Sequence, residues 1–336
     1  MSAERLDYTD EVARTTDPLY EKLSAQYSPE HWKTLAPYIF EINRLKKEKN
    51  AVILAHNYMT PDVFYGVGDV MGDSLLLAQK AAESDADIII QCGVHFMAET
   101  SKILCPEKKV IIPDMQAGCS LAESITGEDV RQLKKQHPGI PVVSYVNTSA
   151  DVKAESDVCC TSSNALKIIN ALGEQGHKTV IMTPDKFLAQ NVAAQTDVEI
   201  IIWDGTCMVH ERFTAEDVKK MRTDHPGIFV LAHPECPPEV MAEADYAGST
   251  AQMDNYIKEH QPDKAVLYTE CSMSDNIAAA NPGVEMIGTC QMCPHMKRIT
   301  LPKILNALRS EGPEVEIDPE IAQRARAPID RMLELS

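Results

Sequence analysis

The sequence has no cluster of basic residues and no long apolar run. Its 336 residues carry 32 lysines and arginines against 50 aspartates and glutamates, a formal net charge of −18. This charge argues against nucleic acid or an anionic membrane as a partner. No segment approaches the roughly 20 apolar residues of a membrane span, and residues 1–14 lack the apolar centre of a secretory signal. We therefore expect a soluble, cytoplasmic protein.

A disulfide framework is also missing. Ten cysteines occur, but in a chain without an export signal we expect reduced thiols, some of which bind metal. Cys290 and Cys293 form the one C-x-x-C pair, which is open to a redox or a zinc interpretation, although zinc is weakened because no second pair exists. Cys159 and Cys160 lie in an apolar strand and are expected to be buried in the core. The cysteines are thus the first place to look for function.

What the sequence does contain is a repeat. Cys119 recurs as Cys207 after 88 residues, Cys293 follows after a further 86, and the tetrapeptide HPGI at 137–140 returns unchanged at 225–228. A fixed period of this length indicates three similar structural units. From Ala51 onward, short β-rich runs alternate with amphipathic helical runs, which is typical of parallel sheets flanked by helices.

The predicted fold class is therefore α/β, with three pseudo-threefold-related three-layer αβα domains that each contain a short parallel sheet. Residues 1–40 are expected to form an N-terminal extension. Domain 1 takes residues 41–118 together with 294–336, because a helix over 299–308 would supply the element that the first repeat lacks. Domain 2 takes residues 119–206 and domain 3 residues 207–293.

Three cysteines at equivalent places would lie around one pseudo-threefold axis. A cubane [4Fe–4S] cluster has threefold axes of its own and is normally held by cysteine thiolates. Cys119, Cys207 and Cys293 could hold three irons and leave the fourth open as a Lewis acid, which favours dehydration chemistry over electron transfer. A lone cysteine is more often a buried structural thiol, but the threefold repetition of one position argues against that alternative.

Polar residues also recur at the ends of equivalent strands and at the starts of equivalent helices. The strand-end residues are His56, Tyr145 and His233, and, two positions later, Tyr58, Asn147 and Glu235. The helix-start residues are Ser74, Ser162 and Thr250. Ligands of parallel α/β proteins bind at the carboxyl ends of strands, and helix N-termini bind carboxylates and phosphates. Each residue alone would more often be structural or a helix cap, but the repetition indicates a shared anion site.

Several runs resemble quinolinate synthase, and the resemblance extends over about residues 40–310. They are AHNYMTPD, GDSLLLAQ, PDMQAGCSLAES, YVNTSADVKAESDVCCTSSNA, WDGTCMVHERF, AHPECPPEV, AGSTAQM and CPHMKRITL. The resemblance implies a pseudo-threefold fold around an oxygen-sensitive [4Fe–4S] cluster. It also implies condensation of iminoaspartate with dihydroxyacetone phosphate to quinolinate in de novo NAD biosynthesis, with release of phosphate and two waters.

The resemblance assigns roles residue by residue. The cluster ligands are Cys119, Cys207 and Cys293, with Cys290 as a non-ligand. The substrate-binding positions are His56, Ser74, Tyr145, Asn147, Ser162, His233, Ser249 and Thr250. The positions implied in catalysis are Glu235, Tyr58 and, a second time, His56. Met59 departs from the family, in which glutamine is common at this position, so the local loop over the site is expected to differ.

The resemblance also implies a functional partner, the L-aspartate oxidase that makes unstable iminoaspartate, and a chain that is a monomer or a homodimer. Two other functions stay open from the residues alone. A [4Fe–4S] hydro-lyase acting on another hydroxyacid would turn over a single substrate. A non-catalytic iron–sulfur sensor or carrier would need the three cysteines but not the repeated polar sets.

Overall fold

The computed structural model describes residues 6–289 and 291–336, so Cys290 lies outside the described residues. It contains three four-stranded sheets, and every strand pair is parallel. The first sheet consists of β1 (Ala51–His56), β2 (Val70–Gly72), β3 (Ile88–Cys92) and β4 (Lys109–Ile111). The second consists of β5 (Val142–Tyr145), β6 (Val158–Cys160), β7 (Thr179–Thr183) and β8 (Glu199–Ile202). The third consists of β9 (Phe229–Ala232), β10 (Tyr246–Ala247), β11 (Lys264–Tyr268) and β12 (Glu285–Ile287).

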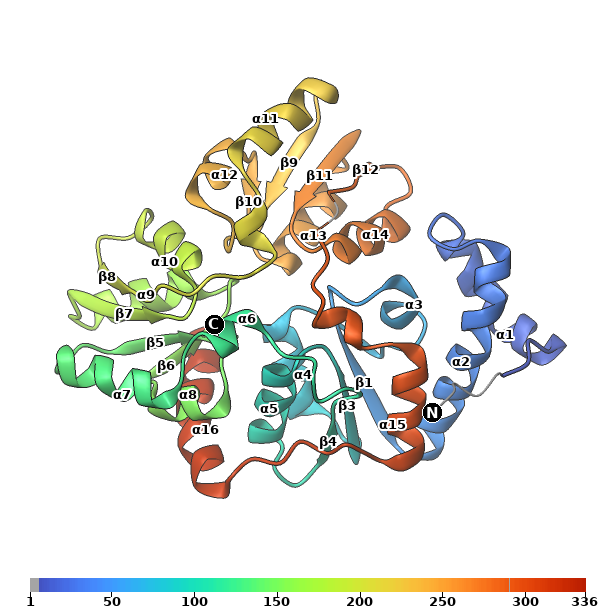
Figure 1. The fold of residues 1–336 in the computed structure, drawn as a ribbon, viewed down its shortest axis with the longest axis horizontal. Helices are drawn as coiled ribbons and strands as arrows, with labels where there is room; N and C mark the ends of the chain where they lie inside the picture. Colours follow the sequence, from blue (N-terminus) through green and yellow to red (C-terminus); the bar gives the residue numbers. More distant parts are fainter. Residues whose placement is uncertain (1–5, 290) are drawn as a thin grey trace.

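The strand orders are the clearest sign of the repeat. They run β2-β1-β3-β4, β6-β5-β7-β8 and β10-β9-β11-β12, so each sheet places its second strand at one edge and its first strand beside it. Figure 1 shows the three sheets in three lobes around a common centre. The predicted α/β fold with three short parallel sheets is confirmed, while the exact domain boundaries stay a prediction.

Helices flank each sheet. The first sheet is accompanied by α3 (Pro61–Phe64), α4 (Ser74–Glu83) and α5 (His95–Leu104). The second is accompanied by α6 (Ser120–Glu123), α7 (Gly127–Gln136), α8 (Ala150–Glu155), α9 (Ala165–Glu174) and α10 (Lys186–Ala193). The third is accompanied by α11 (Ala215–Asp224), α12 (Pro238–Glu243), α13 (Thr250–His260) and α14 (Cys271–Ala280). Short 3-10 helices, η1 (His210–Arg212) and η2 (Met296–Arg298), follow two of the repeated cysteines.

Local sequence explains where equivalent helices begin. Thr126 and Asp129 form a capping box at the start of α7, and Thr214 and Asp217 form the same box at the start of α11. In each box the threonine hydroxyl accepts a hydrogen bond from the aspartate N–H, while the aspartate carboxylate accepts one from the threonine N–H. Two backbone donors are satisfied reciprocally at each helix start. The Thr and Asp residues that recur in the sequence therefore start equivalent helices in two repeats.

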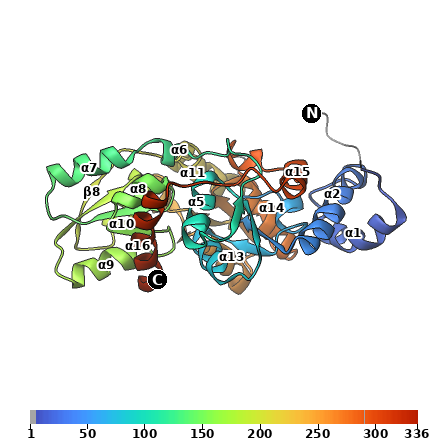
Figure 2. The ribbon, with the colours of Figure 1, turned by 90° about the horizontal axis from the view of Figure 1, so that it is seen from below.

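The chain ends pack against the lobes in different places. At the N-terminus, α1 (Asp10–Leu23) is followed by α2 (Pro29–Glu48), which begins at a proline and has Ser28 as its cap. The helix expected over 299–308 is α15 (Leu301–Ser310), which packs on α2 and β3. The last helix, α16 (Pro319–Leu335), packs mainly on α8 and β6 and also touches α5. Figure 2 shows the flattened molecule with α1 and α2 at one end.

The hydrophobic cores divide unequally. One cluster of buried side chains runs through the first two lobes, including Ile90, Val143 and Ile329, whereas Val230 and Leu267 belong to separate clusters in the third lobe. Polar contacts that join the third lobe to the first include the hydrogen bonds from Asn57 Nδ2 to Thr250 Oγ1 and from Asn276 Nδ2 to the Asn57 carbonyl. Within the part of the chain that the structure describes, no helix combines the length and apolar character that a membrane span requires.

Candidate active site

Equivalent loops of the repeats contact each other at the centre of the molecule. Ser120 and Met208 directly follow Cys119 and Cys207, and the Met208 N–H donates to Ser120 Oγ at 3.1 Å. Between the first and third lobes, Asn57 Nδ2 donates to Thr250 Oγ1 at 2.9 Å. The first contact joins equivalent segments of two repeats, and the second joins a strand end of the first lobe to a helix start of the third.

A central cavity of about 700 Å³, part of it open to solvent, receives side chains from all three lobes. Twelve of the thirteen residues that the sequence assigns to binding, catalysis or the metal line it. They are His56, Tyr58, Ser74, Cys119, Tyr145, Asn147, Ser162, Cys207, His233, Glu235, Thr250 and Cys293, of which only His56 carries two roles, so the lining set is the whole predicted set apart from Ser249.

Ser249 lies outside the wall of the cavity. It is fully buried, and its hydroxyl caps α13 by accepting a hydrogen bond from the Gln252 N–H at 3.3 Å. The Ser249 N–H in turn donates to Gln252 Oε1 at 2.8 Å, so the two residues form a capping box. Its hydroxyl is thus engaged in holding the helix start that presents Thr250.

The three helix-start residues are not fully equivalent. Ser74 and Thr250 are the first residues of α4 and α13, where free backbone N–H groups point outward. Ser162 instead lies in the turn before α9, whose cap is Asn164. Asn164 Oδ1 accepts a hydrogen bond from the Thr161 N–H at 2.6 Å and so holds this turn open. The second repeat therefore presents a turn where the other two present a helix end.

The three repeated thiols are the ones that face the cavity. Cys119, Cys207 and Cys293 line it and are partly exposed, whereas Cys159 and Cys160 are fully buried, as expected for core residues. Burial raises the pKa of Cys119 to about 12 and lifts the pKa of Cys207 and of Cys293 above the usual thiol range.

Two of these thiols also interact electrostatically with another of the three. A negative charge on Cys293 raises the pKa of Cys119, and one on Cys119 raises the pKa of Cys207, which places the sulfurs within electrostatic reach of one another. Several soft sulfur donors around one cavity are suited to an iron–sulfur cluster. Bound metal would deprotonate them in spite of their raised pKa. The donor set therefore fits the predicted group.

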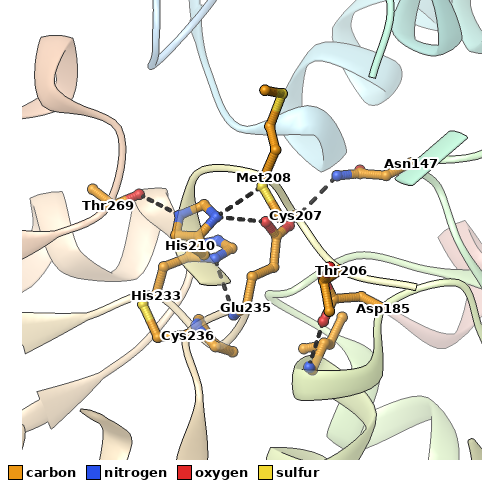
Figure 3. A network of polar contacts seen from close by, with 12 residues as sticks. Asn147, Asp185, Thr206, Cys207, Met208, His210, His233, Glu235, Cys236 and Thr269 are labelled. Carbon is orange, nitrogen blue, oxygen red and sulfur yellow. Dashed lines mark hydrogen bonds and ion pairs between the residues drawn. The ribbon is translucent and has the colours of Figure 1, made fainter. Parts of the chain in front are cut away.

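A second donor set overlaps with the first. Cys207 Sγ, a ring nitrogen of His210 and a carboxylate oxygen of Glu235 all lie within 4.8 Å of one another, close enough to hold a metal ion. His210 Nδ1 is 3.2 Å from Cys207 Sγ and 2.8 Å from Glu235 Oε2 (Figure 3). Cys207 is thus common to both ways of binding metal at this site.

Glu235 is the most densely contacted acid of the site. Its Oε1 accepts a hydrogen bond from the Tyr145 hydroxyl at 2.6 Å and a longer one from Asn147 Nδ2 at 3.4 Å. Burial raises the pKa of Glu235, but the neighbouring His210 and His233 and the hydrogen bonds from His210 and Tyr145 lower it further, so the net pKa lies below the usual range. Glu235 is therefore ionised and able to accept a proton.

The neighbouring side chains of His56, His233 and Tyr58 are uncharged. Burial lowers the pKa of His56 and of His233 to about 3, so both imidazoles are neutral. Burial and the charge of Glu235 raise the pKa of Tyr58 well above its usual value, so its phenol keeps its proton. The cavity thus holds an ionised carboxylate, neutral imidazoles and a protonated phenol side by side.

Sequence reasoning missed four residues around this cavity. His210 and Glu270 line it, Thr269 lies behind Tyr58, and Lys297 forms an ion pair with Glu270 at 2.7 Å. The search for repeated polar sets could not find His210, because Ala122 and Met296 occupy the equivalent places. It passed over Lys297 because the equivalent Glu123 and Glu211 carry the opposite charge. The only sequence signal is that His210 and Lys297 stand three and four positions after a repeated cysteine.

The fold and the site define an α/β enzyme of three repeated units whose central cavity carries thiols for a metal group. Residues 40–334 match the family model described as "Quinolinate synthetase A protein". The chain belongs to this family. It is 59% identical over 329 residues to the quinolinate synthase of Caulobacter vibrioides, covering 98% of this chain and 90% of the relative. It is 56% identical over 330 residues to the quinolinate synthase of Sinorhizobium medicae, and the match covers 98% of this chain and 91% of that relative.

Proposed function

We infer that this protein acts as a quinolinate synthase, which condenses iminoaspartate with dihydroxyacetone phosphate and releases phosphate and two waters. The product, quinolinate, is a precursor in NAD biosynthesis. The observation that carries this conclusion is the convergence of three repeated thiols and three repeated polar sets on one cavity, in a chain 59% identical to a quinolinate synthase.

The cofactor that fits this cavity is a [4Fe–4S] cluster held by Cys119, Cys207 and Cys293. When bound, it would supply an iron without a cysteine ligand, a Lewis acid suited to reactions that lose water. His210 and Glu235 lie beside Cys207 and would keep that side of the cavity polar.

The anionic groups of the substrates would be held by local dipoles, because the chain as a whole repels anions. The starts of α4 and α13 offer free N–H groups and hydroxyls at Ser74 and Thr250, and Ser162 offers a third hydroxyl from its turn. Ser249 contributes by fixing the start of α13. Phosphate and carboxylate groups are the chemistry that these positions would recognise.

The strand-end residues would orient the carbon chain. His56, His233 and Tyr145 line the cavity, and the imidazoles are neutral, so each can donate one hydrogen bond and accept another. Asn147 Oδ1 is buried and has no hydrogen-bond partner among the described residues. An unsatisfied buried oxygen is costly, and a donor on the substrate would satisfy it.

Protons would move through Glu235 and Tyr58. Glu235 is ionised and can take a proton from carbon or nitrogen during tautomerisation, while Tyr58 keeps its proton and can give one to a leaving hydroxyl. His56 stacks edge-on against Tyr58, with ring centroids 4.8 Å apart, and its Nδ1 accepts a hydrogen bond from the Tyr58 N–H at 3.2 Å. His56 would thereby take part in both binding and catalysis.

The proposed function also places the protein among its partners. Iminoaspartate is unstable in water, so an L-aspartate oxidase must supply it and is the expected functional partner. Both would work in the cytoplasm, with the present chain as a monomer or a homodimer. Because no long apolar helix occurs among the described residues, the proposal needs no membrane contact.

The test is a product assay with anaerobically purified protein. Iminoaspartate generated in the assay and dihydroxyacetone phosphate are supplied together, and quinolinate and phosphate are measured. We expect the two products in equal amounts and none when either substrate is omitted. Turnover of a single hydroxyacid without the triose phosphate would instead show a hydro-lyase, and the absence of quinolinate from protein loaded with metal would overturn the proposal.

A further inference from the structure

Thr269 is a buried hydroxyl directly behind the cavity. It follows β11 in the third lobe, has a relative exposure of 1%, and is not among the residues that line the cavity. Its Oγ1 lies 2.6 Å from the Tyr58 hydroxyl, which follows β1 in the first lobe. A short hydrogen bond therefore joins two lobes at the phenol that we propose as the acid.

The same hydroxyl has a second partner. Thr269 Oγ1 lies 3.0 Å from His210 Nε2, and the other ring nitrogen of His210 lies 2.8 Å from Glu235 Oε2. Figure 3 shows His210 between Thr269 and Glu235. A continuous line of polar contacts thus runs from Tyr58 through Thr269 and His210 to Glu235, and Thr269, the one member that does not line the cavity, is the link that spans the two lobes.

A threonine hydroxyl has one proton and can accept further hydrogen bonds. Because Thr269 contacts two polar neighbours, the direction of its one O–H is coupled to the direction of the Tyr58 O–H. For Tyr58 to give its proton into the cavity, Thr269 must donate to the Tyr58 oxygen and accept from His210 Nε2, and both contacts allow this direction. Loss of the hydroxyl would leave the phenol without the partner that holds it.

We propose that Thr269 is a positioning residue that holds the Tyr58 hydroxyl in place for proton donation and ties it to the His210–Glu235 pair. This inference rests on the proposed function, since it concerns the same reaction. Thr269 does not line the cavity, so it would act through its neighbours, mainly through Tyr58 and also through His210. A misplacement of a reacting group by about 1 Å can cost on the order of 100-fold in rate.

The test compares Thr269→Val, which keeps the volume but removes the hydroxyl, with Thr269→Ser, which keeps the hydroxyl. We expect Thr269→Val to lower kcat by about 10- to 100-fold, with KM within about twofold and an unchanged melting temperature. Thr269→Ser should stay within about threefold of the wild-type kcat. If Thr269→Val does not fold, Thr269→Ala, a second variant without the hydroxyl, is measured in its place. It should show the same loss of kcat.

A double-mutant cycle with Tyr58→Phe separates positioning from a structural role. If Thr269 acts through Tyr58, Thr269→Val should cause no further loss of kcat in the Tyr58→Phe background. Wild-type kcat in both hydroxyl-free variants, or an equal loss with and without the Tyr58 hydroxyl, would overturn the inference. If the wild-type protein itself made no quinolinate, the proposed function would fail instead, so the two failures are distinguishable.

Discussion

Asn147 and Glu235 stand 88 positions apart, at the same place in two copies of the repeat, and they contact each other. Asn147 Nδ2 donates to Glu235 Oε1 at 3.4 Å, and Tyr145 donates to the same oxygen at 2.6 Å. Residues that are equivalent by repetition meet only if the copies converge on one point. The repeat therefore builds the site as well as the fold, because the second copy donates hydrogen bonds to the Glu235 carboxylate of the third.

The charge of Glu235 should matter for turnover and not for assembly. We expect Glu235→Gln, which keeps the shape, to lower kcat by about 100-fold or more, because a general base contributes about 10²- to 10⁴-fold. Iron content should stay at the wild-type level. Quinolinate formation under saturating substrates is the measurement, and Glu239→Gln, the same change at an exposed position of α12, is the matched control. A wild-type rate in Glu235→Gln would remove Glu235 from the acid–base role.

Acid should destabilise the metal-free chain through its buried histidines. The pKa of His56 and of His233 is lowered by burial to about 3, whereas an unfolded histidine has a pKa of about 6.5. Between these values the unfolded state binds more protons. The free energy of unfolding therefore falls as pH drops from about 6.5 toward 3, by up to about 1.4 kcal/mol per pH unit for each histidine.

Urea denaturation at several pH values between 7 and 5 measures this effect. His56→Gln should reduce the pH dependence of the unfolding free energy, because one of the buried imidazoles is gone. His31→Gln, at an exposed position of α2, should leave it as in the wild type. Identical pH dependences for His56→Gln and the wild type would contradict the assignment of His56 as a buried neutral imidazole.

The Lys297–Glu270 ion pair should stabilise the contact between the first and third lobes. Lys297 Nζ lies 2.7 Å from Glu270 Oε1 and also donates to the Tyr58 carbonyl at 2.9 Å, while Glu270 accepts from the Cys293 N–H at 3.3 Å. The Glu270 side chain is only 1% exposed. Lys297→Met would leave a buried carboxylate without its partner, at a cost of about 3 kcal/mol.

Chemical denaturation of Lys297→Met measures that cost, and the double variant with Glu270→Gln should recover part of it because no buried charge remains. The control is Lys220→Met, which breaks an exposed pair with Asp224 and should cost less than about 1 kcal/mol. Equal stability of Lys297→Met and the wild type would show that the pair does not support the interface.

The period of the sequence predicted much of this architecture. The 88-residue offset predicted three short parallel sheets, and the polar residues that recur with it were found around the cavity. Strands such as β2 and β10 could not be predicted, because two or three residues carry no usable alternation pattern. Nor could α16, whose packing on α8 depends on a chain end that returns to the second lobe.

His210 escaped prediction because its position is polar in a single copy of the repeat. Ala122 occupies the place in the second repeat that His210 occupies in the third, so no polar set marks that position. The importance of Thr269 comes from its 2.6 Å contact with Tyr58, a residue 211 positions away. Contacts between lobes are set by tertiary packing, which local sequence does not record.

Metal analysis of cysteine variants tests the proposed cluster most directly. Anaerobically purified wild-type protein should contain about four irons and four sulfides per chain. Cys119→Ser, Cys207→Ser and Cys293→Ser should each lose most of that iron, whereas Cys105→Ser, at a buried position away from the cavity, should retain it. A single zinc ion, or a full complement of iron in both Cys119→Ser and Cys293→Ser, would contradict a cluster held by the three repeated cysteines.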